Sequence, residues 1–251
     1  VARVHVEPPL AGMQVQATVP LSAGECLDYR AALRLDIQDP QRWRFGGSYP
    51  ASCGERLWPL AHPDPARFAA RALEGMWQQL GGQLQGSVRE GVVPQGLRPV
   101  LALESAPLAE VVRDINKFSN NVMAQQLFLT LSWQPQGVGR FEASRDLVMR
   151  WWRTRIGAED LVLDNGSGLS RSERVTAMGL ARLLSQAWTA PYASELMSSL
   201  PLAGHDGTLR RYSSHTVAHL KTGSLRDVVG VAGYVDGRQG ERWVVVAIIN
   251  H

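Results

Sequence analysis

Short apolar stretches separated by proline and glycine dominate the first sixty residues, for example at residues 15–19 and 33–37. This spacing predicts β-rich structure with frequent turns. The pattern changes after Asp64-Pro65, where apolar residues recur every three or four positions up to Gly81-Gly82. A helix is predicted between these pairs, because proline fits the first helical turn and glycine commonly follows the last. Its apolar face consists of Phe68, Ala72, Leu73, Met76, Trp77 and Leu80.

Helical periodicity dominates the middle of the chain. Apolar spacing there predicts a strand at 100–103, then helices starting at Leu108 and at Ser119, and two more at 145–156 and 175–188. The apolar positions of these helices fit a core and imply no cofactor. A tight, glycine-containing loop at 164–168 separates the last two helices, and it is either one wall of a cleft or an ordinary turn.

Three apolar runs close the chain, at residues 217–222, 228–235 and 242–249. The short connections between them predict antiparallel neighbours. Strands that follow a cluster of helices indicate an α/β (α+β) domain with an antiparallel sheet flanked by helices. We therefore expect two regions, a β-rich one at 1–64 and an α/β domain at 65–251.

Composition fits a globular protein and argues against a nucleic-acid partner and a membrane span. The chain has 251 residues, 45% of them hydrophobic, which suffices for one domain and part of another. Its net charge is +3, and 24 of its 26 basic residues are arginines scattered along the chain, so nucleic acid is not an expected partner. No apolar run approaches about 18 residues, so no membrane span is predicted. These features do not indicate an oligomeric state.

The two cysteines, Cys26 and Cys53, both lie in stretches rich in Gly, Ser and Pro. A disulfide between them would add roughly 3 kcal/mol by closing the intervening loop, and it would favour an oxidising compartment. The alternative is a pair of free thiols in a cytosolic protein. No metal site is predicted, because His215 and His219 lack a nearby Cys or Glu partner.

Two short motifs carry the candidate chemistry. Lys221-Thr222-Gly223 has the form K-T-G, and about a hundred residues upstream Ser119 and Asn121 form S-x-N. Enzymes that acylate a serine with a D-alanyl peptide or a β-lactam combine these two motifs with a third, S-x-x-K, which supplies the nucleophile.

The third motif is absent from the chain. Its only lysines are Lys117 and Lys221, and the residues three places before them are Asp114 and Ala218. These 251 residues therefore do not contain that nucleophile.

The K-T-G motif has a physical rationale. Lys221 and Thr222 would offer a charge and a hydroxyl to a substrate carboxylate. Gly223 would let an extended peptide approach the backbone, and Ser224 could direct its N–H toward an oxyanion. The alternative for Lys221 is a solvated lysine on a strand.

The S-x-N residues would act beside that strand. Ser119 would relay a proton, and Asn121 would hold a substrate amide. The alternative for Ser119 is a helix N-cap. If the motifs share one site, the Ser119 Oγ and Lys221 Nζ atoms should lie about 2.7 to 3.2 Å apart. Two unrelated residues predict no such proximity.

Four blocks of sequence around these motifs resemble the low-molecular-mass class C penicillin-binding proteins, which are D-alanyl-D-alanine carboxypeptidases/endopeptidases of the peptidase S13 family. The blocks follow the order of the family and cover most of the chain: 114–131 (DINKFSNNVMAQQLFLTL), 163–171 (LDNGSGLSR), 200–210 (LPLAGHDGTLR) and 218–228 (AHLKTGSLRDV).

The resemblance implies a serine β-lactamase/transpeptidase-like fold and accounts for the missing motif. In this family S-x-x-K lies near the mature N-terminus, and large inserted domains separate it from S-x-N. We therefore expect a fragment that is incomplete at both ends. Residues 1–64 would be the remnant of an inserted domain, and residues 65–251 would be a partial penicillin-binding domain.

The implied function is cleavage of peptidoglycan peptides ending in D-Ala-D-Ala, in the periplasm, through an acyl-serine intermediate and without a cofactor. β-Lactams would bind at the same site. Two alternatives remain, a non-catalytic peptidoglycan-binding module and a serine β-lactamase. A Ser-x-x-Lys sequence upstream of Val1 would distinguish the enzyme from the binding module.

Overall fold

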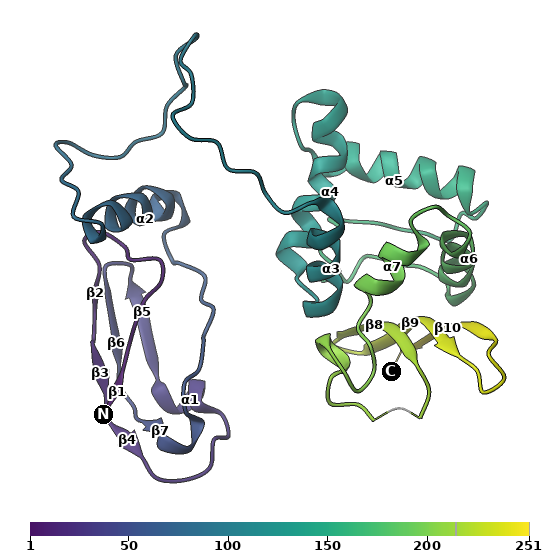
Figure 1. Cartoon of the computed structure of the whole chain (residues 1–251), viewed down its shortest axis with the longest axis horizontal. Helices are drawn as coiled ribbons and strands as arrows, with labels where there is room; N and C mark the ends of the chain where they lie inside the picture. The colour runs from purple at the N-terminus through teal and green to yellow at the C-terminus, as the bar shows by residue number, and fades with distance from the viewer. Residues whose placement is uncertain (214, 251) are drawn as a thin grey trace. The chain divides into compact units, whose positions relative to one another are not determined.

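Two units make up the structure, a computed structural model that describes residues 1–213 and 215–250 (Figure 1). The first unit spans Val1–Val100 and the second Leu101–His251. Each has its own buried residues.

Short strands are the main regular structure of residues 1–64, the range predicted to be β-rich. β2 (Gln14–Val15), β6 (Arg42–Phe45) and β5 (Leu35–Asp39) form a three-stranded sheet in that order. Two-stranded pairs join β1 (Ala2–Arg3) to β3 (Thr18–Val19) and β4 (Leu21–Ser22) to β7 (Tyr49–Pro50). The helix α1 (Tyr29–Leu33) precedes β5. The buried hydrophobic residues of the first unit are Leu10, Val19, Leu33, Trp43, Cys53 and Ala72.

The predicted helix after Asp64 is α2 (Pro65–Gln79), and Asp64 caps it by accepting a hydrogen bond from the Arg67 N–H. Its predicted apolar face is only partly correct, because Ala72 is buried whereas Leu73 and Trp77 are more than half exposed. The buried side of α2 packs on the first unit, where the Arg71 carbonyl accepts a hydrogen bond from the Ala11 N–H at 3.0 Å. The helix α2 therefore belongs to the first unit. The boundary expected from the sequence, after residue 64, would instead place it in the second unit.

The strand predicted at residues 100–103 is wrong. Residues 80–107 form neither helix nor strand, and Val100, Leu101 and Leu103 are largely exposed. A strand gains stability from a paired neighbour, and these residues have none to pair with in the described chain.

The described residues of the second unit form helices and an antiparallel sheet (Figure 1), as predicted, although the helix at Ala193–Ser199 was not predicted. The helices are α3 (Leu108–Phe118), α4 (Asn121–Gln136), α5 (Phe141–Arg155), α6 (Ala177–Trp188) and α7 (Ala193–Ser199). The strands, in the order β10-β9-β8, are β10 (Arg242–Asn250), β9 (Val228–Asp236) and β8 (Ala218–Leu225).

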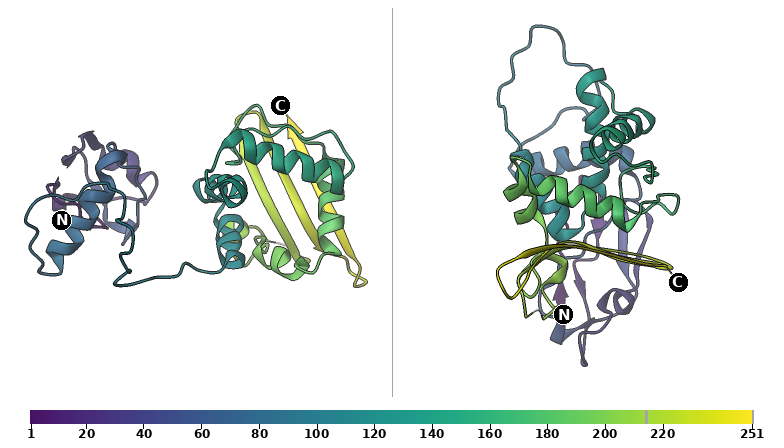
Figure 2. Two further views of the ribbon diagram at one scale, coloured as in Figure 1. Left: turned by 90° about the horizontal axis from the view of Figure 1, so that it is seen from above. Right: turned by 90° about the vertical axis from the view of Figure 1, so that its right-hand side faces the viewer.

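The helices of this unit cover one face of the sheet (Figure 2). Leu184 of α6, Leu200 and Tyr234 of β9 form a buried cluster between the two layers. A hydrogen bond from the Tyr234 hydroxyl to the Leu184 carbonyl at 2.8 Å satisfies the buried phenol. In the described part of the chain, no helix is long and apolar enough to cross a membrane.

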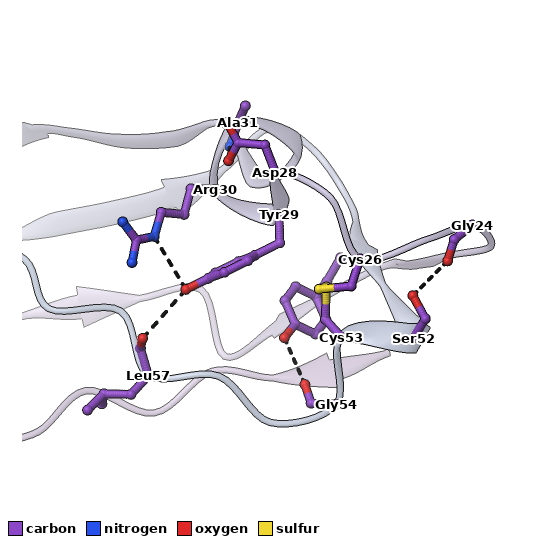
Figure 3. The surroundings of a disulfide bond; sticks show 11 residues. Gly24, Cys26, Asp28, Tyr29, Arg30, Ala31, Ser52, Cys53, Gly54 and Leu57 are labelled. Atoms are coloured by element: carbon purple, nitrogen blue, oxygen red, sulfur yellow. Dashed lines mark hydrogen bonds between the residues drawn. A yellow bond between two sulfur atoms is a disulfide. The ribbon is translucent and has the colours of Figure 1, made fainter. Parts of the chain in front are cut away.

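The two cysteines are joined in the structure, as predicted (Figure 3). The Cα atoms of Cys26 and Cys53 lie 4.8 Å apart. A hydrogen bond from the Ser52 hydroxyl to the Gly24 carbonyl at 2.7 Å supports the same contact between the two loops. The disulfide thus ties the segment after β4 to the segment after β7.

Replacing both cysteines with serine should lower the free energy of unfolding of the first unit by about 3 kcal/mol, because the unfolded chain regains the entropy of the opened loop. Denaturant unfolding followed by tryptophan fluorescence would measure the loss. Ser52→Ala is the matched control, since it removes one neighbouring hydrogen bond and should cost only about 1 kcal/mol. Intact mass after thiol alkylation tests the bond directly, and two alkylated cysteines in the unreduced protein would contradict it.

Candidate active site

The Ser119-Asn120-Asn121 segment forms the break between α3 and α4. Ser119 ends α3 in the left-handed conformation (φ 52°, ψ 48°). Asn120 caps α4 by accepting a hydrogen bond from the Met123 N–H at 3.0 Å. The prediction that α4 begins at Ser119 is therefore wrong by two residues, and the N-cap role belongs to Asn120. Because the chain changes direction here, the Ser119 and Asn121 side chains are free to make contacts outside both helices.

Lys221 lies on β8 and directs its ammonium group toward this break. Its Nζ donates to the Ser119 Oγ at 2.8 Å and to the Thr222 carbonyl at 2.7 Å. The predicted proximity of Ser119 and Lys221 is confirmed, although 102 residues separate them in the sequence. A solvated lysine on an unrelated strand does not account for this contact.

The direction of this hydrogen bond determines what the serine can do. An ammonium group only donates, so the Ser119 oxygen accepts, and its own proton remains available to another acceptor. Burial lowers the pKa of Lys221, because the charged form loses solvation. The pair thus combines a hydroxyl donor with an ammonium that can release its proton more easily than an ordinary lysine.

The pKa of Lys221 can be measured directly, because the chain contains only two lysines. Selective ¹³Cε-lysine labelling should give two NMR signals, and the one assigned to Lys221 should titrate below its ordinary pKa of 10.5. The lowered pKa means that the unfolded chain binds more protons between the folded and unfolded pKa values. This group should therefore make the fold more stable as pH rises through that interval. A Lys221 signal that titrates at or above 10.5 would contradict the burial.

An open cavity of about 550 Å³ lies beside this pair. Four of the predicted residues line it, namely Ser119, Thr222, Gly223 and Ser224, whereas Lys221 and Asn121 do not. The remaining lining residues are Thr208, Tyr212, Val229, Gly230, Val231, Ala247 and Ile249. The cavity therefore has polar groups at the β8 edge and apolar side chains across the sheet.

Gly223 leaves space at this edge. Apart from Gly223 and its two chain neighbours, no described residue has an atom within 4 Å of the position that a Cβ would take. In the described chain, β8 is also an edge strand of its three-stranded sheet. Residues 201–203 already pair with its first residues, through hydrogen bonds from the Leu220 N–H to the Pro201 carbonyl and from the Ala203 N–H to the Ala218 carbonyl. The outer backbone that an added strand could pair with is therefore the part of β8 that follows Leu220.

Asn121 reaches the loop predicted as a possible wall of the cleft. Its Nδ2 donates to the Ser167 carbonyl at 2.6 Å, which leaves the side-chain oxygen for another donor. Farther along the loop, Arg171 forms an ion pair with Asp227 at 2.9 Å, in the turn between β8 and β9. The loop thus connects the S-x-N segment to the far end of the K-T-G strand.

Thr208 is a site residue that the sequence analysis missed. Its Oγ1 lies 3.2 Å from the Thr222 Oγ1, and it lines the cavity. The only sequence signal was its place in the 200–210 block, where the polar run Asp206-Gly207-Thr208 follows an apolar stretch. Nothing in the spacing of that run identifies its partner on β8.

The chain belongs to the D-Ala-D-Ala carboxypeptidase 3 (S13) family, whose pattern it matches over residues 3–251. It is 32% identical over 219 residues to the D-alanyl-D-alanine carboxypeptidase of Actinomadura sp. (strain R39), covering 82% of this chain and 40% of that protein. It is 28% identical over 193 residues to D-alanyl-D-alanine carboxypeptidase DacB of Haemophilus influenzae, covering 73% of this chain and 40% of that protein. The chain thus spans about two fifths of the length of these relatives.

The fold is also found in a solved structure. Penicillin binding protein 4 (dacB) from Haemophilus influenzae, complexed with a β-lactam, superposes with a TM-score of 0.67 at 24% sequence identity. The match covers 86% of this chain and 51% of that one. The penicillin-binding protein fold that the motifs implied is confirmed.

Proposed function

We propose that the protein is a serine-type D-alanyl-D-alanine carboxypeptidase/endopeptidase that acts on peptidoglycan peptides. The observation that carries this proposal is the hydrogen bond between Lys221 and Ser119 at the margin of a cavity lined by Thr222, Gly223 and Ser224. Family membership supports the reaction class, and the activity names of the relatives support the substrate.

The substrate peptide would lie along the outer edge of β8. Its terminal carboxylate would bind the Thr222 hydroxyl within the field of the Lys221 ammonium, because both groups favour an anion. The Gly223 position leaves room for the peptide backbone. Asn121 would accept a hydrogen bond from a substrate amide through its free side-chain oxygen, while its nitrogen stays bonded to the Ser167 carbonyl.

The reaction would proceed by acyl transfer. The serine of an S-x-x-K motif, outside these 251 residues, would attack the carbonyl carbon as its hydroxyl proton passes to the lysine of the same motif, and the Ser224 N–H would stabilise the resulting oxyanion. Ser119 then passes its proton to the leaving D-alanine amine as the C–N bond breaks, and it is reprotonated from the Lys221 side. Water hydrolyses the acyl-serine ester and releases the shortened peptide. A β-lactam would acylate the same serine, but its amine would remain attached to the acyl group.

The location proposed for this enzyme is the periplasm. The Cys26–Cys53 disulfide supports an oxidising compartment, which cytosolic proteins rarely experience. A peptidoglycan substrate would be present in the same compartment.

Labelling with a fluorescent penicillin tests the proposal. A protein that includes the sequence upstream of Val1 should be labelled stoichiometrically, whereas residues 1–251 alone should not be labelled, because an acyl-enzyme requires the nucleophile. Labelling of the 251-residue chain would place the nucleophile within it. A longer protein that contains no Ser-x-x-Lys and resists labelling would instead indicate a non-catalytic peptidoglycan-binding module.

A further inference from the structure

The other lysine of the chain, Lys117, lies two residues before Ser119 on the last turn of α3. Its Nζ donates to the Leu200 carbonyl and to the Asp206 Oδ2, both at 2.7 Å. The Lys117 side chain is only 13% exposed, whereas the Asp206 side chain is 45% exposed, so the ammonium is largely desolvated while the carboxylate keeps part of its hydration. This contact joins α3 to the segment that follows α7.

Asp206 transmits this contact to the segment that carries Thr208. Its Oδ1 accepts a hydrogen bond from the Leu202 N–H at 2.8 Å, so the carboxylate fixes the 202–206 turn while it binds Lys117. Burial alone would raise the pKa of Asp206, but the hydrogen bonds from Leu202 and Lys117 outweigh it and lower the pKa. The carboxylate therefore stays ionised and paired over a wide pH range.

Gly207 brings this segment against the backbone of α3. It has a positive φ of 55°, and a Cβ at this position would lie 2.6 Å from the Lys117 carbonyl oxygen. The next residue, Thr208, is within hydrogen-bonding distance of Thr222 on β8. Lys117 thus anchors one segment that presents Ser119 and another that presents Thr208, and both meet the K-T-G strand.

The choice of lysine at position 117 is unusual for this chain. Of 26 basic residues 24 are arginines, and both lysines occur in these contacts around Ser119. A lysine ammonium is a compact point charge, whereas a guanidinium is a planar fork that needs more room. Two acceptors at 2.7 Å next to the close approach of Gly207 suit the smaller group.

We infer that Lys117 and Asp206 form a positioning pair that holds Ser119 and Thr208 against β8 and so sets the environment of the Lys221 ammonium. The pair does not touch the cavity, and it acts through the residues that do. The consequence for catalysis rests on the proposed function, but the effect on Lys221 does not.

The Lys221 NMR signal tests this inference in the 251-residue chain, without any need for activity. Lys117→Met keeps the length of the side chain and removes its charge and donors. We expect the fold to persist and the pKa of Lys221 to rise toward its ordinary value, because a loosened Ser119 and Thr208 would admit water to the ammonium. Asp206→Asn keeps an acceptor for the Leu202 N–H and should shift the pKa in the same direction. It carries the test if the Lys117 variant does not fold.

Asn116→Ala is the matched control. Asn116 is the neighbour of Lys117 and also joins α3 to α7, by a hydrogen bond from its Nδ2 to the Ser199 Oγ at 2.8 Å. Its loss should lower the melting temperature without changing the pKa of Lys221. If Lys117→Met and Asp206→Asn leave the pKa of Lys221 unchanged and only lower the melting temperature, the pair is an ordinary structural tie and the inference is wrong.

A catalytic measurement separates this inference from the proposed function. In a protein that includes the upstream sequence, Lys117→Met should lower the rate of penicillin acylation by about 10²-fold, through misplacement of Ser119. Lys117→Arg should not restore the rate, because the larger group cannot occupy the same space. Full-rate acylation of folded Lys117→Met would overturn the inference. If the unsubstituted protein is not acylated at all, the proposed function fails, while the Lys221 titration still decides the role of the pair.

Discussion

Replacing Lys221 with alanine should lower the rate of acylation by penicillin by about 10²- to 10³-fold in a protein that also contains the proposed S-x-x-K nucleophile, the typical effect of removing one preorganised electrostatic group. The ammonium would be lost both as a donor to Ser119 and as a charge near the substrate carboxylate. The fold should change little, because the side chain contacts polar atoms at a cavity margin rather than the buried cluster of the sheet. Stopped-flow acylation and thermal unfolding of the same samples would measure both effects.

Arg226→Ala is the control for this substitution. Arg226 is an exposed cation in the turn just after β8, so its removal changes the net charge by the same amount as Lys221→Ala. Its acylation rate should stay within a fewfold of the original. If Lys221→Ala behaves like Arg226→Ala, the proposed role of Lys221 is wrong.

Replacement by alanine at two glycines of the same sheet should affect different properties, stability at Gly233 and acylation at Gly223. At Gly233 on β9, a Cβ would lie 2.0 Å from the His219 carbonyl oxygen, and φ is +155°. Gly233→Ala should therefore destabilise the second unit by about 3 kcal/mol or more, because backbone atoms of β8 must move. At Gly223 on β8 the same methyl meets no atom within 4 Å from any described residue other than its two chain neighbours.

Gly223→Ala should consequently keep its stability within about 1 kcal/mol of the original. It should nevertheless lower penicillin acylation by about tenfold or more, because the methyl occupies the proposed path of the ligand. Denaturant unfolding and acylation rates, measured for both variants, would distinguish a glycine required by the fold from one required by the ligand. Normal acylation of Gly223→Ala would show that the ligand does not pass this edge.

Much of the second unit could be predicted from the sequence, because its apolar periods are long and its strands are joined by short turns. The Ser119–Lys221 contact could also be predicted, but only from two motifs taken together, since each alone has an ordinary structural explanation. The left-handed conformation of Ser119 could not be foreseen, because a serine before a helix more commonly serves as its N-cap. The real cap, Asn120, belongs to the same motif.

The failures have a common physical origin in contacts between distant segments. Residues 100–103 have the composition of a strand, but no strand of the described chain pairs with them. The buried side of α2 includes Ala72, whereas its larger apolar residues Leu73 and Trp77 are more than half exposed. Thr208 and the Lys117–Asp206 pair depend on the meeting of α3, the segment after α7 and β8. Local sequence carries no information about such a meeting.

At Ser119 the backbone conformation that favours stability and the side chain that the proposed activity needs call for different residues. A non-glycine residue at φ 52° is held in a sparsely populated region, which costs on the order of 1 kcal/mol. Glycine adopts that conformation without strain, so selection for stability alone would favour Ser119→Gly. That replacement would also remove the hydroxyl that meets Lys221. A screen for thermostable variants of a protein that also contains the S-x-x-K nucleophile should therefore enrich proteins that fold better and are acylated more slowly, and an activity requirement would be needed to retain the serine.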